Sequence, residues 1–517
     1  MKHKSQLILA ALCAAPFASG ITYLDETVAG INKLNNGVGQ APSYEIDTNL
    51  NLGTAFPGET EFVLPAVVFV NNGATLTIPA GTIMRGQPRI VAGTSDAPGA
   101  LIVTEDGMID AVGTATAPII WTTAATGTIG SFAKYVKGNQ SPVWLDPSPL
   151  LSPLAPQISG TNTTKLWGGV ALLGKAPNNL AGTRPPGLVG RGTLEGLPAS
   201  AGANAYYGGS NPNDSSGRII YNSIRHNGDI LADGDEIQGL TLGSAGYGTE
   251  LKYIEIYCSA DDGIEIFGGT SFMDHILISF VEDDGLDLDQ GYSGAIQYLV
   301  SIMANNTTYP SFGGGNAGEW DGDDYSSSFD STGLPLTYPT FYNMTFVGAS
   351  DNGNKGLNAD TGWGGNLYNS IVYNFPTEGF AFGNGGFPGT NSSDRIANDT
   401  IDFSGVVFFN SPSTTANAGT VISSGFNNTT AITLLGNSQV VGTNGLIPVP
   451  TGSATEYAVF PSFGLGVGYT GNYFTPASYK GAFDPDTTAT IWTTGWTALN
   501  HLDMIPDRAD GLDVDGL

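Results

Sequence analysis

Cysteine is scarce in this chain of 517 residues, and so is charge. There are two cysteines, Cys13 and Cys258, and Cys13 lies in an N-terminal segment that we expect to be removed. A single remaining cysteine excludes an internal disulfide framework, so packing, hydrogen bonds or a bound metal must stabilise the mature protein. Only 13% of the residues are charged, which excludes both a disordered polyelectrolyte and a helical bundle rich in Ala, Glu, Lys and Leu.

Basic residues are particularly few. The chain has 18 Lys and Arg against 47 Asp and Glu, a formal net charge of −29. Such a field repels nucleic acid and anionic membranes and attracts cations, so we expect no nucleic-acid partner. A saline habitat also selects an acidic surface, and the charge alone therefore does not identify a cation-binding protein.

The N-terminal stretch "MKHKSQLILAALCAAPFASG" is typical of a secretory signal peptide. Two lysines precede an apolar run over 7–15 and a small-residue cleavage site, Ala18-Ser19-Gly20. The run is too short to span a bilayer, and no later stretch predicts a transmembrane helix. We therefore expect a mature chain that is secreted or held at the cell surface.

Glycine is abundant, with 73 residues, and it interrupts stretches rich in Val, Ile, Thr, Phe and Tyr. This pattern predicts an all-β chain of short strands joined by turns. One phrase recurs, an aromatic residue or His followed by branched apolar residues, and it begins at Tyr221, Tyr253, His275, Tyr298, Tyr342, Tyr368 and Phe403. Its shortest spacings, 22 and 23 residues, suit one coil of a β-solenoid, and the longer ones suit coils with an inserted loop.

Several stretches carry a family resemblance: "GATLTIPAGTIMRG", "GALIVTEDGMIDAVGTATAPIIWTT", "LWGGVALLGKAP", "IQGLTLGSAGYGTELKYIEIYCSADDGIEIFGG" and "YKGAFDPDTTATIWTTGWTAL". Together they resemble a family of secreted bacterial right-handed parallel β-helix proteins, distantly similar to the pectate-lyase superfamily. The resemblance implies this fold and export, but no particular activity, because a fold does not determine a function. We predict a signal peptide over 1–20, a right-handed parallel β-helix domain with loop insertions over 21–499, and an acidic tail over 500–517.

The central part of the chain repeats its acids. "DDGIEI", which starts at Asp261, returns 22 residues later as "DDGLDL", which starts at Asp283. Equivalent residues of successive coils stack about 4.8 Å apart, so these phrases should form one patch. The alternation of a strand directs the Ile and Leu residues into the core and Glu265, Asp287 and Asp289 outward. Asn305 and Asn306 follow one coil later, and the column of acids is expected to stop there.

Stacked carboxylates repel one another, and a cation would remove that repulsion. Carboxylates of neighbouring coils supply the oxygen ligands that Ca²⁺ prefers. The candidate calcium ligands are Asp261, Asp262, Glu265, Asp283, Asp284, Asp287 and Asp289. A second possible site contains Asp321, Asp323 and Asp324, and a third contains Asp507, Asp510, Asp513 and Asp515.

Two other interpretations of the column stay open. Paired aspartates on adjacent coils carry out hydrolysis in the pectin-cleaving enzymes of this superfamily, and the equivalent candidates here are Asp261, Asp262, Asp283 and Asp284. A lyase would instead need a basic residue, for which Arg225, Lys252 and His275 have the nearest coil phase. The third interpretation is purely structural: "DDG" forms a corner of the β-helix, in which the acids cap backbone amides.

We expect an exported, calcium-stabilised protein of the cell surface or the extracellular space that binds glycans or other surface or matrix components, as an adhesin or matrix element does. The alternatives are a polysaccharide lyase or glycoside hydrolase and a subunit that self-assembles into a fibre or layer. Catalysis is the less favoured of these, because the Gly-His-Gly turn and the Arg-x-Lys clamp of the pectin hydrolases are not found in the sequence.

Overall fold

The computed structural model describes most of the chain after the expected signal peptide. The described residues are 21–34, 42–89, 97–127, 129–130, 143–144, 157–158, 164–180, 190–197, 199–231, 235–304, 315–322, 334–348, 355–383, 395, 401–411, 434–436, 447–450, 469, 471–484, 490–501, 505 and 507–508. The signal peptide over 1–20 lies outside them, and so does most of the expected tail over 500–517.

The first layer of the fold is an 11-stranded sheet that carries the acids. Its strands, in spatial order, are β2 (Ile31–Leu34), β3 (Ser43–Ile46), β6 (Val67–Val70), β9 (Ala100–Val103), β16 (Val170–Leu173), β20 (Leu240–Gly243), β22 (Ile264–Phe267), β24 (Leu286–Asp289), β26 (Gly318–Asp321), β29 (Lys355–Asp360) and β32 (Glu378–Phe382). Every neighbouring pair is parallel except β2 with β3.

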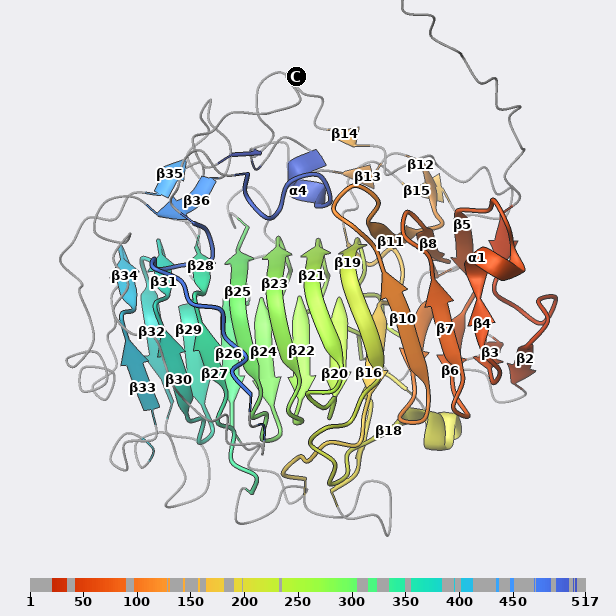
Figure 1. The fold of residues 1–517 in the computed structure, drawn as a ribbon, viewed down its shortest axis with the longest axis horizontal. Coiled ribbons are helices and arrows are strands. Elements are labelled where there is room, and N and C mark those ends of the chain that lie inside the picture. The colour runs from red at the N-terminus through yellow and green to blue at the C-terminus, as the bar shows by residue number, and fades with distance from the viewer. Residues whose placement is uncertain are drawn as a thin grey trace, which may run out of the picture.

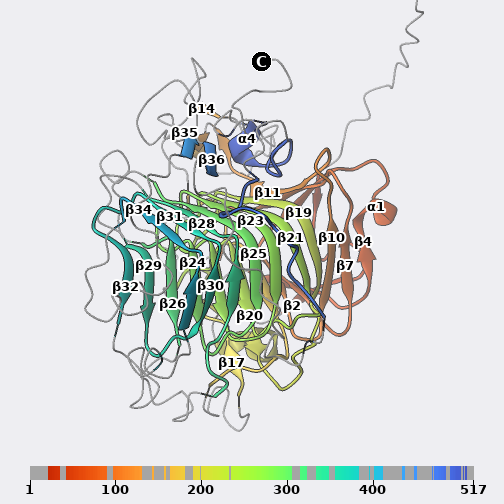
Figure 2. The same ribbon diagram turned by 60° about the vertical axis from the view of Figure 1, so that its left-hand side comes forward.

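A 17-stranded sheet forms the rest of each coil. Its strands are β1 (Thr22–Tyr23), β4 (Leu50–Asn51), β5 (Glu61–Leu64), β7 (Thr75–Ile78), β8 (Ile83–Gly86), β10 (Met108–Val112), β11 (Ile119–Thr123), β19 (Gly217–Arg225), β21 (Glu250–Tyr257), β23 (Phe272–Ser279), β25 (Ala295–Ile302), β27 (Thr340–Tyr342), β28 (Thr345–Val347), β30 (Gly365–Tyr368), β31 (Ile371–Tyr373), β33 (Ile401–Ser404) and β34 (Val407–Phe409). The coils follow one another from the N-terminal end in red to β34 in blue (Figure 1), and the turned view shows the same stack (Figure 2).

The remaining described elements are short. The strand pairs are β12 (Thr126–Gly127) with β15 (Gln157–Ile158), β13 (Ile129–Gly130) with β14 (Val143–Trp144), β17 (Gly192–Thr193) with β18 (Tyr206–Tyr207), and β35 (Leu434–Gly436) with β36 (Ile447–Pro450). The helices are α1 (Leu52–Ala55), the 3₁₀ helix η2 (Ala199–Ala205) and α4 (Ala498–His501). Within the described ranges, no helix is long and apolar enough to cross a membrane. The predicted all-β, parallel β-helix fold class is confirmed.

The register of the sheet confirms that one coil takes 22 residues at the repeated phrase. Ile264 pairs with Leu286, and Ile266 pairs with Leu288, in the parallel ladder of β22 and β24. All four side chains are fully buried in the main core cluster. Because side chains alternate along a strand, Glu265 and Asp287 then leave the core on the opposite face of the sheet.

Four of the repeated aromatic phrases mark a bend in the long strands. Tyr221, Tyr253, His275 and Tyr298 have positive φ values between 52° and 59°. The rings of Tyr221, Tyr253 and His275 stack, with Tyr221 and Tyr253 parallel to within 4° at a centroid distance of 4.2 Å, and the Tyr298 ring lies against His275 at a tilt of 37°. The left-handed backbone is uncommon for such side chains, and the stacking of equivalent rings on successive coils accompanies it.

The later phrases are displaced by one residue from the predicted alignment. Tyr342 pairs with Gln297 and with Tyr368, so it precedes the bend, and the bend itself is occupied by Asn343. Asn tolerates a left-handed backbone better than Tyr does, which explains why the aromatic residue moves off the bend in these coils. The predicted equivalence of Tyr298 with Tyr342 is therefore wrong by one position.

The C-terminal part of the chain packs back against the 17-stranded sheet. Glu255, which is fully buried in β21, accepts hydrogen bonds from the backbone N–H groups of Ala498 at 2.6 Å and Leu499 at 3.3 Å. Trp496 meets the Tyr221 and Tyr253 rings edge-on. In both views α4 lies at the end of this sheet where β19 and β11 finish (Figures 1 and 2).

Candidate metal centre

The repeated Asp-Asp-Gly phrase builds a corner of the β-helix. Asp262 Oδ1 accepts a hydrogen bond from the backbone N–H of Asp284 at 2.8 Å, and Asp284 Oδ1 accepts one from the backbone N–H of Asn316. Each side chain thus caps the equivalent residue of the next coil. The corner interpretation therefore accounts for one oxygen of each of these two carboxylates.

The glycines of the phrase are needed for space. Neither Gly263 nor Gly285 has a positive φ. A Cβ atom on Gly263 would lie 2.4 Å from Ile278 Cγ2 and 2.6 Å from the carbonyl oxygen of Gly285. Such approaches are shorter than van der Waals contact, so the coils can stack this closely only with glycine at the position. The two glycines therefore provide space for close stacking of the coils and do not form a left-handed turn.

The mid-strand acids form a second column beside the corner. Glu265 pairs with Asp287 in β22 and β24, and Asp287 pairs with Glu319 in β26. The column therefore continues beyond the coil where it was expected to stop. Asn305 and Asn306, the residues expected to end it, lie outside the described residues, and Asn316 takes the corner position instead.

The column brings together most of the predicted ligands in two groups of three. One oxygen each of Asp261, Asp262 and Asp283 lie within 4.8 Å of one another, and the same holds for Asp262, Glu265 and Asp287. We call these the outer triad and the inner triad. Asp283 is exposed at the open end of the outer triad, whereas Asp262 and Glu265 are each only 7% exposed. Asp262, which belongs to both triads, is thus a buried carboxylate among four others.

The separation of these oxygens matches a calcium ion. Ca²⁺ binds oxygen at about 2.3–2.6 Å, so two of its ligands lie no more than about 5 Å apart. At that distance two charged carboxylates repel by about 1 kcal/mol in water and several times more when partly buried. The buried inner triad therefore needs a bound cation or bound protons, whereas water can also stabilise the more exposed carboxylates of the outer triad.

Burial raises the pKa of every carboxyl in the two triads. It raises the pKa of Asp261 to about 7, with Glu236, Glu195 and Asp283 adding repulsion. Burial places the pKa of Asp262, Glu265 and Asp287 well above the usual range of a carboxyl group. Repulsion from neighbouring carboxylates adds to the shift. The direction is the one expected when buried carboxylates crowd together.

Two residues that the sequence analysis did not single out complete this site. Glu195, from the segment between β16 and β19, lies within hydrogen-bonding reach of Glu265, carboxyl to carboxyl. Gln238 Nε2 donates to Glu195 Oε1 at 2.5 Å and lies 3.5 Å from Asp261 Oδ2. Gln238 is the corner residue of the preceding coil, so a register search could have found it, but Glu195 lies outside the coil repeat.

The other predicted ligands do not belong to the two triads. Asp284 and Asp289 are not part of either triad. Asp321 is next to Asp289 on the following coil, and burial with repulsion from Asp289 raises its pKa to about 8. Asp507 is far along the chain and accepts a hydrogen bond from Asn500 Nδ2 at 2.9 Å. The remaining candidates, Asp323, Asp324, Asp510, Asp513 and Asp515, lie outside the described residues.

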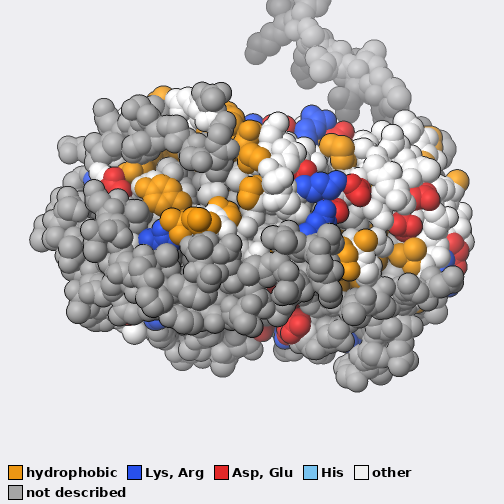
Figure 3. Space-filling view, turned by 90° about the horizontal axis from the view of Figure 1, so that it is seen from below, with side chains coloured by type: hydrophobic (Ala, Val, Ile, Leu, Met, Phe, Trp, Pro, Cys, Tyr) orange, Lys and Arg blue, Asp and Glu red, His pale blue; other side chains and the backbone are white. Residues whose placement is uncertain are grey.

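The basic residues considered for catalysis belong to the other sheet. Arg225, Lys252 and His275 lie in β19, β21 and β23, whereas the acids lie in the 11-stranded sheet or in the corners just before its strands β22 and β24. At the rim of the acidic column, Lys165 Nζ lies 3.3 Å from Glu236 Oε1, and both side chains are partly exposed. On the face of the molecule seen from below, Lys and Arg side chains likewise lie beside Asp and Glu side chains (Figure 3).

The comparisons with known proteins agree with the architecture. A family model described as a pectate-lyase like beta helix domain matches residues 49–134 and 157–447, a span that contains both triads, Gln238 and Glu195. No curated protein and no solved structure matches the chain. Because the matched residues make up well over half of the sequence, the chain belongs to the family of pectate-lyase like beta helix domains.

Proposed function

We propose that this is an exported β-helix protein of the cell surface or extracellular space that binds calcium in its acidic column and contacts acidic glycans through that calcium. The observation that carries the proposal is the pair of overlapping triads, in which the buried Asp262 is shared by two sets of carboxylates whose oxygens lie within 4.8 Å of one another. A cation is the simplest partner for such a group in an exported protein.

Calcium suits the donor set better than other common metals. The ligand atoms are all carboxylate oxygens, which favours hard cations over zinc or copper. Ca²⁺ accepts six to eight ligands in flexible geometry, whereas Mg²⁺ requires a near-ideal octahedron. Glu265 Oε2 adds to the proposal, because it is buried and no N–H or O–H group of the described residues donates to it.

The outer triad supports the glycan part of the proposal. Asp283 is exposed and Asp261 is partly exposed, so an ion held there keeps coordination positions that face solvent. Uronate or sulfate groups of a glycan can occupy those positions. A chain of net charge −29 repels an acidic glycan unless a bound cation lies between them, so binding should depend on calcium.

The test of calcium binding uses isothermal titration of the chelator-treated protein with Ca²⁺ and Mg²⁺, together with thermal melts. We expect Ca²⁺ to bind and to raise the melting temperature, and Mg²⁺ to do so far less. An unchanged melting temperature with no heat of binding would remove the calcium proposal.

The test of glycan binding uses immobilised alginate or pectin, with dextran as a neutral control. Asp283→Asn should weaken calcium-dependent retention by about tenfold, because one charged ligand of the open triad is lost. Asp287→Asn, which alters only the inner triad, should reduce the thermal effect of calcium more than it reduces retention. Retention that persists in chelator would contradict a calcium-mediated contact.

Glycan hydrolysis is a second candidate, and one observation favours it. The pKa of Asp261 is raised to about 7, mainly by burial, and its carboxyl lies beside the exposed Asp283. An acid with a pKa near neutrality beside a second carboxylate resembles the pair that a retaining glycosidase uses. New reducing ends released from a polysaccharide, and lost in Asp261→Asn, would establish hydrolysis, and their absence across acidic and neutral glycans would exclude it.

A further inference from the structure

A segment outside the coil repeat covers the acidic column. This cover segment comprises residues 190–197 and 199–208, with β17, η2 and β18, and it lies along the lower edge of the coils (Figure 1). Its apolar side chains Leu194, Leu197 and Tyr207 are buried against outward-facing residues of the 11-stranded sheet, among them Phe267. Tyr207 also stacks on the Phe267 ring at 6.0 Å. The cover is therefore attached to the same sheet face that carries the triads.

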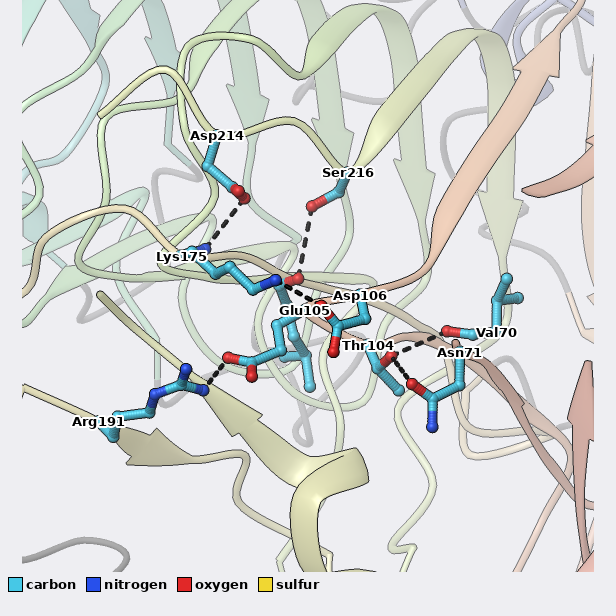
Figure 4. A network of polar contacts seen from close by, with 10 residues as sticks. Val70, Asn71, Thr104, Glu105, Asp106, Lys175, Arg191, Asp214 and Ser216 are labelled. Atoms are coloured by element: carbon cyan, nitrogen blue, oxygen red, sulfur yellow. Dashed lines mark hydrogen bonds and ion pairs between the residues drawn. The ribbon is translucent and has the colours of Figure 1, made fainter. Parts of the chain in front are cut away.

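Polar contacts hold the cover on the side of the earlier coils. Arg191 forms an ion pair with Glu105 in the turn after β9, and Figure 4 shows the two side chains directed toward each other. Asn204 Oδ1 accepts a hydrogen bond from Asn71 Nδ2 at 2.8 Å. Each of these contacts joins groups of opposite charge or complementary polarity, so they stabilise the closed cover without any ion.

Where the cover segment contacts the acidic column, a carboxyl group of the cover lies against a carboxyl group of the column. The Glu195 carboxyl lies within hydrogen-bonding reach of the Glu265 carboxyl. Gln238 Nε2 donates to Glu195 Oε1 at 2.5 Å and lies 3.5 Å from Asp261 Oδ2, which places Glu195 at the edge of the acidic column. Within the part of the chain that the structure describes, the buried Glu265 Oε2 has no hydrogen-bond donor. Two facing carboxylates repel when both are ionised, so this contact is stable only with a shared proton or a cation between the groups.

We propose that Glu195 is a further ligand of the cation in the inner triad, so that the ion fastens the cover segment to the β-helix. The inference rests on the proposed calcium site. It adds that the bound ion, besides stabilising the column, controls whether the cover segment stays closed. Glu195 lies beside Glu265 but outside the 4.8 Å group of the inner triad, so its side chain would move toward the ion to become a ligand. When both carboxyls are ionised, loss of the ion leaves Glu195 and Glu265 in direct repulsion and favours opening of the cover at this side.

Hydrogen exchange of the full chain at pH 8, followed by mass spectrometry, tests the proposal with Ca²⁺ alone or with a chelator. In the natural protein, calcium should slow deuterium uptake by peptides over 190–208 about tenfold. In Glu195→Gln the Gln238 hydrogen bond can remain, because the amide keeps an acceptor oxygen, but the charge is lost. Calcium should then change uptake by the cover less than about twofold.

The chelator measurement separates a ligand from an ordinary structural side chain. If Glu195 is repelled by Glu265, Glu195→Gln should slow uptake by the cover in chelator, whereas loss of a merely structural contact would speed it. The matched control is Glu105→Gln, which weakens the Arg191 ion pair away from the column. It should speed uptake by the cover, while leaving the calcium effect in place.

The outcomes distinguish the two proposals. Calcium that binds and raises the melting temperature, but leaves uptake by the cover unchanged, would overturn the role of Glu195 and keep the calcium site. An undiminished calcium effect in Glu195→Gln would also overturn it. If titration of the natural protein detects no calcium binding, the proposed calcium site is wrong, and so is the proposed role of Glu195 in fastening the cover segment.

Discussion

Asp262 accepts the backbone N–H of Asp284 at 2.8 Å, and it also belongs to both carboxylate triads. One side chain therefore has two separable tasks. Its Oδ1 atom caps the corner of the next coil, while its charge contributes to the proposed cation site. These tasks can be separated by a substitution that keeps the acceptor oxygen and removes the charge.

Asp262→Asn is such a substitution. The amide oxygen can still accept the Asp284 N–H, and the amide nitrogen becomes a donor next to Glu265 and Asp287. We expect calcium affinity to fall by more than about tenfold, because both triads lose their common ligand. In chelator the melting temperature should rise, because buried repulsion is relieved.

Calorimetric titration and thermal melts of the same samples check this prediction. Asp110→Asn is the control, since Asp110 pairs with Arg218 on an exposed part of the surface. It should leave calcium affinity unchanged. Equal calcium affinity in Asp262→Asn and the natural protein would show that the triads do not hold the ion.

The stability of the calcium-free protein should fall as the pH rises from about 4 to about 8. The folded protein holds Asp261 at a pKa of about 7 and Asp321 at about 8, mainly through burial, whereas an unfolded Asp has a pKa of about 3.9. Between these values the folded state binds more protons than the unfolded state, so raising the pH destabilises it. Below about pH 4 both states are protonated, and this contribution to stability is fully present.

Melts from pH 4 to pH 8.5 in chelator, repeated with calcium, measure this effect. Calcium should reverse the loss at high pH, because it binds the ionised carboxylates, and should have little effect near pH 4. A calcium-free stability that rises steadily across this range would contradict the crowded, proton-holding column.

Gly263→Ala should destabilise the protein by about 2–3 kcal/mol, because the added Cβ would collide with Ile278 and with the backbone oxygen of the next coil. Gly73→Ala is the comparison, since its Cβ would enter open space and only its φ of 77° opposes alanine. That change should cost about 1 kcal/mol. Denaturant unfolding measures both, and a similar small cost at the two positions would show that the corner can relax.

Glu255→Ala should release the C-terminal segment from the sheet. The buried carboxylate accepts the N–H groups of Ala498 and Leu499 and a hydrogen bond from Ser223, so its removal leaves these donors without their acceptor. Such a loss costs about 1–3 kcal/mol or more. Limited proteolysis should then cut near residues 490–501 sooner than in the natural protein, and Glu255→Gln, which keeps an acceptor oxygen, should be affected less.

The repeated phrase made the core of the site predictable. Glu265 and Asp287 are 22 residues apart with no insertion between them, so the coil period alone placed them together. Glu319 was missed because 32 residues separate it from Asp287, although the two pair directly in the sheet. A β-helix keeps the register of its strands rather than the length of its loops, and a fixed period therefore fails after an insertion.

Glu195 was beyond prediction for a different reason. Its position depends on the burial of Leu194 and Leu197 against the outside of the 11-stranded sheet, a contact between segments with no common period. The signal available in the sequence is an acid flanked by two leucines, in "TLEGL", because leucines are more often buried than exposed. That signal indicates burial but does not identify the partner.

The stacked rings at the bend give the protein an intrinsic optical reporter. Tyr221 and Tyr253 lie parallel at 4.2 Å, a separation at which their electronic transitions couple, and Trp496 meets both rings edge-on. Light absorbed by the tyrosines can therefore pass to a tryptophan carried by the C-terminal segment. Near-ultraviolet circular dichroism and tyrosine-to-tryptophan energy transfer would then follow the docking of that segment in the unlabelled protein, independently of any change at the acidic column.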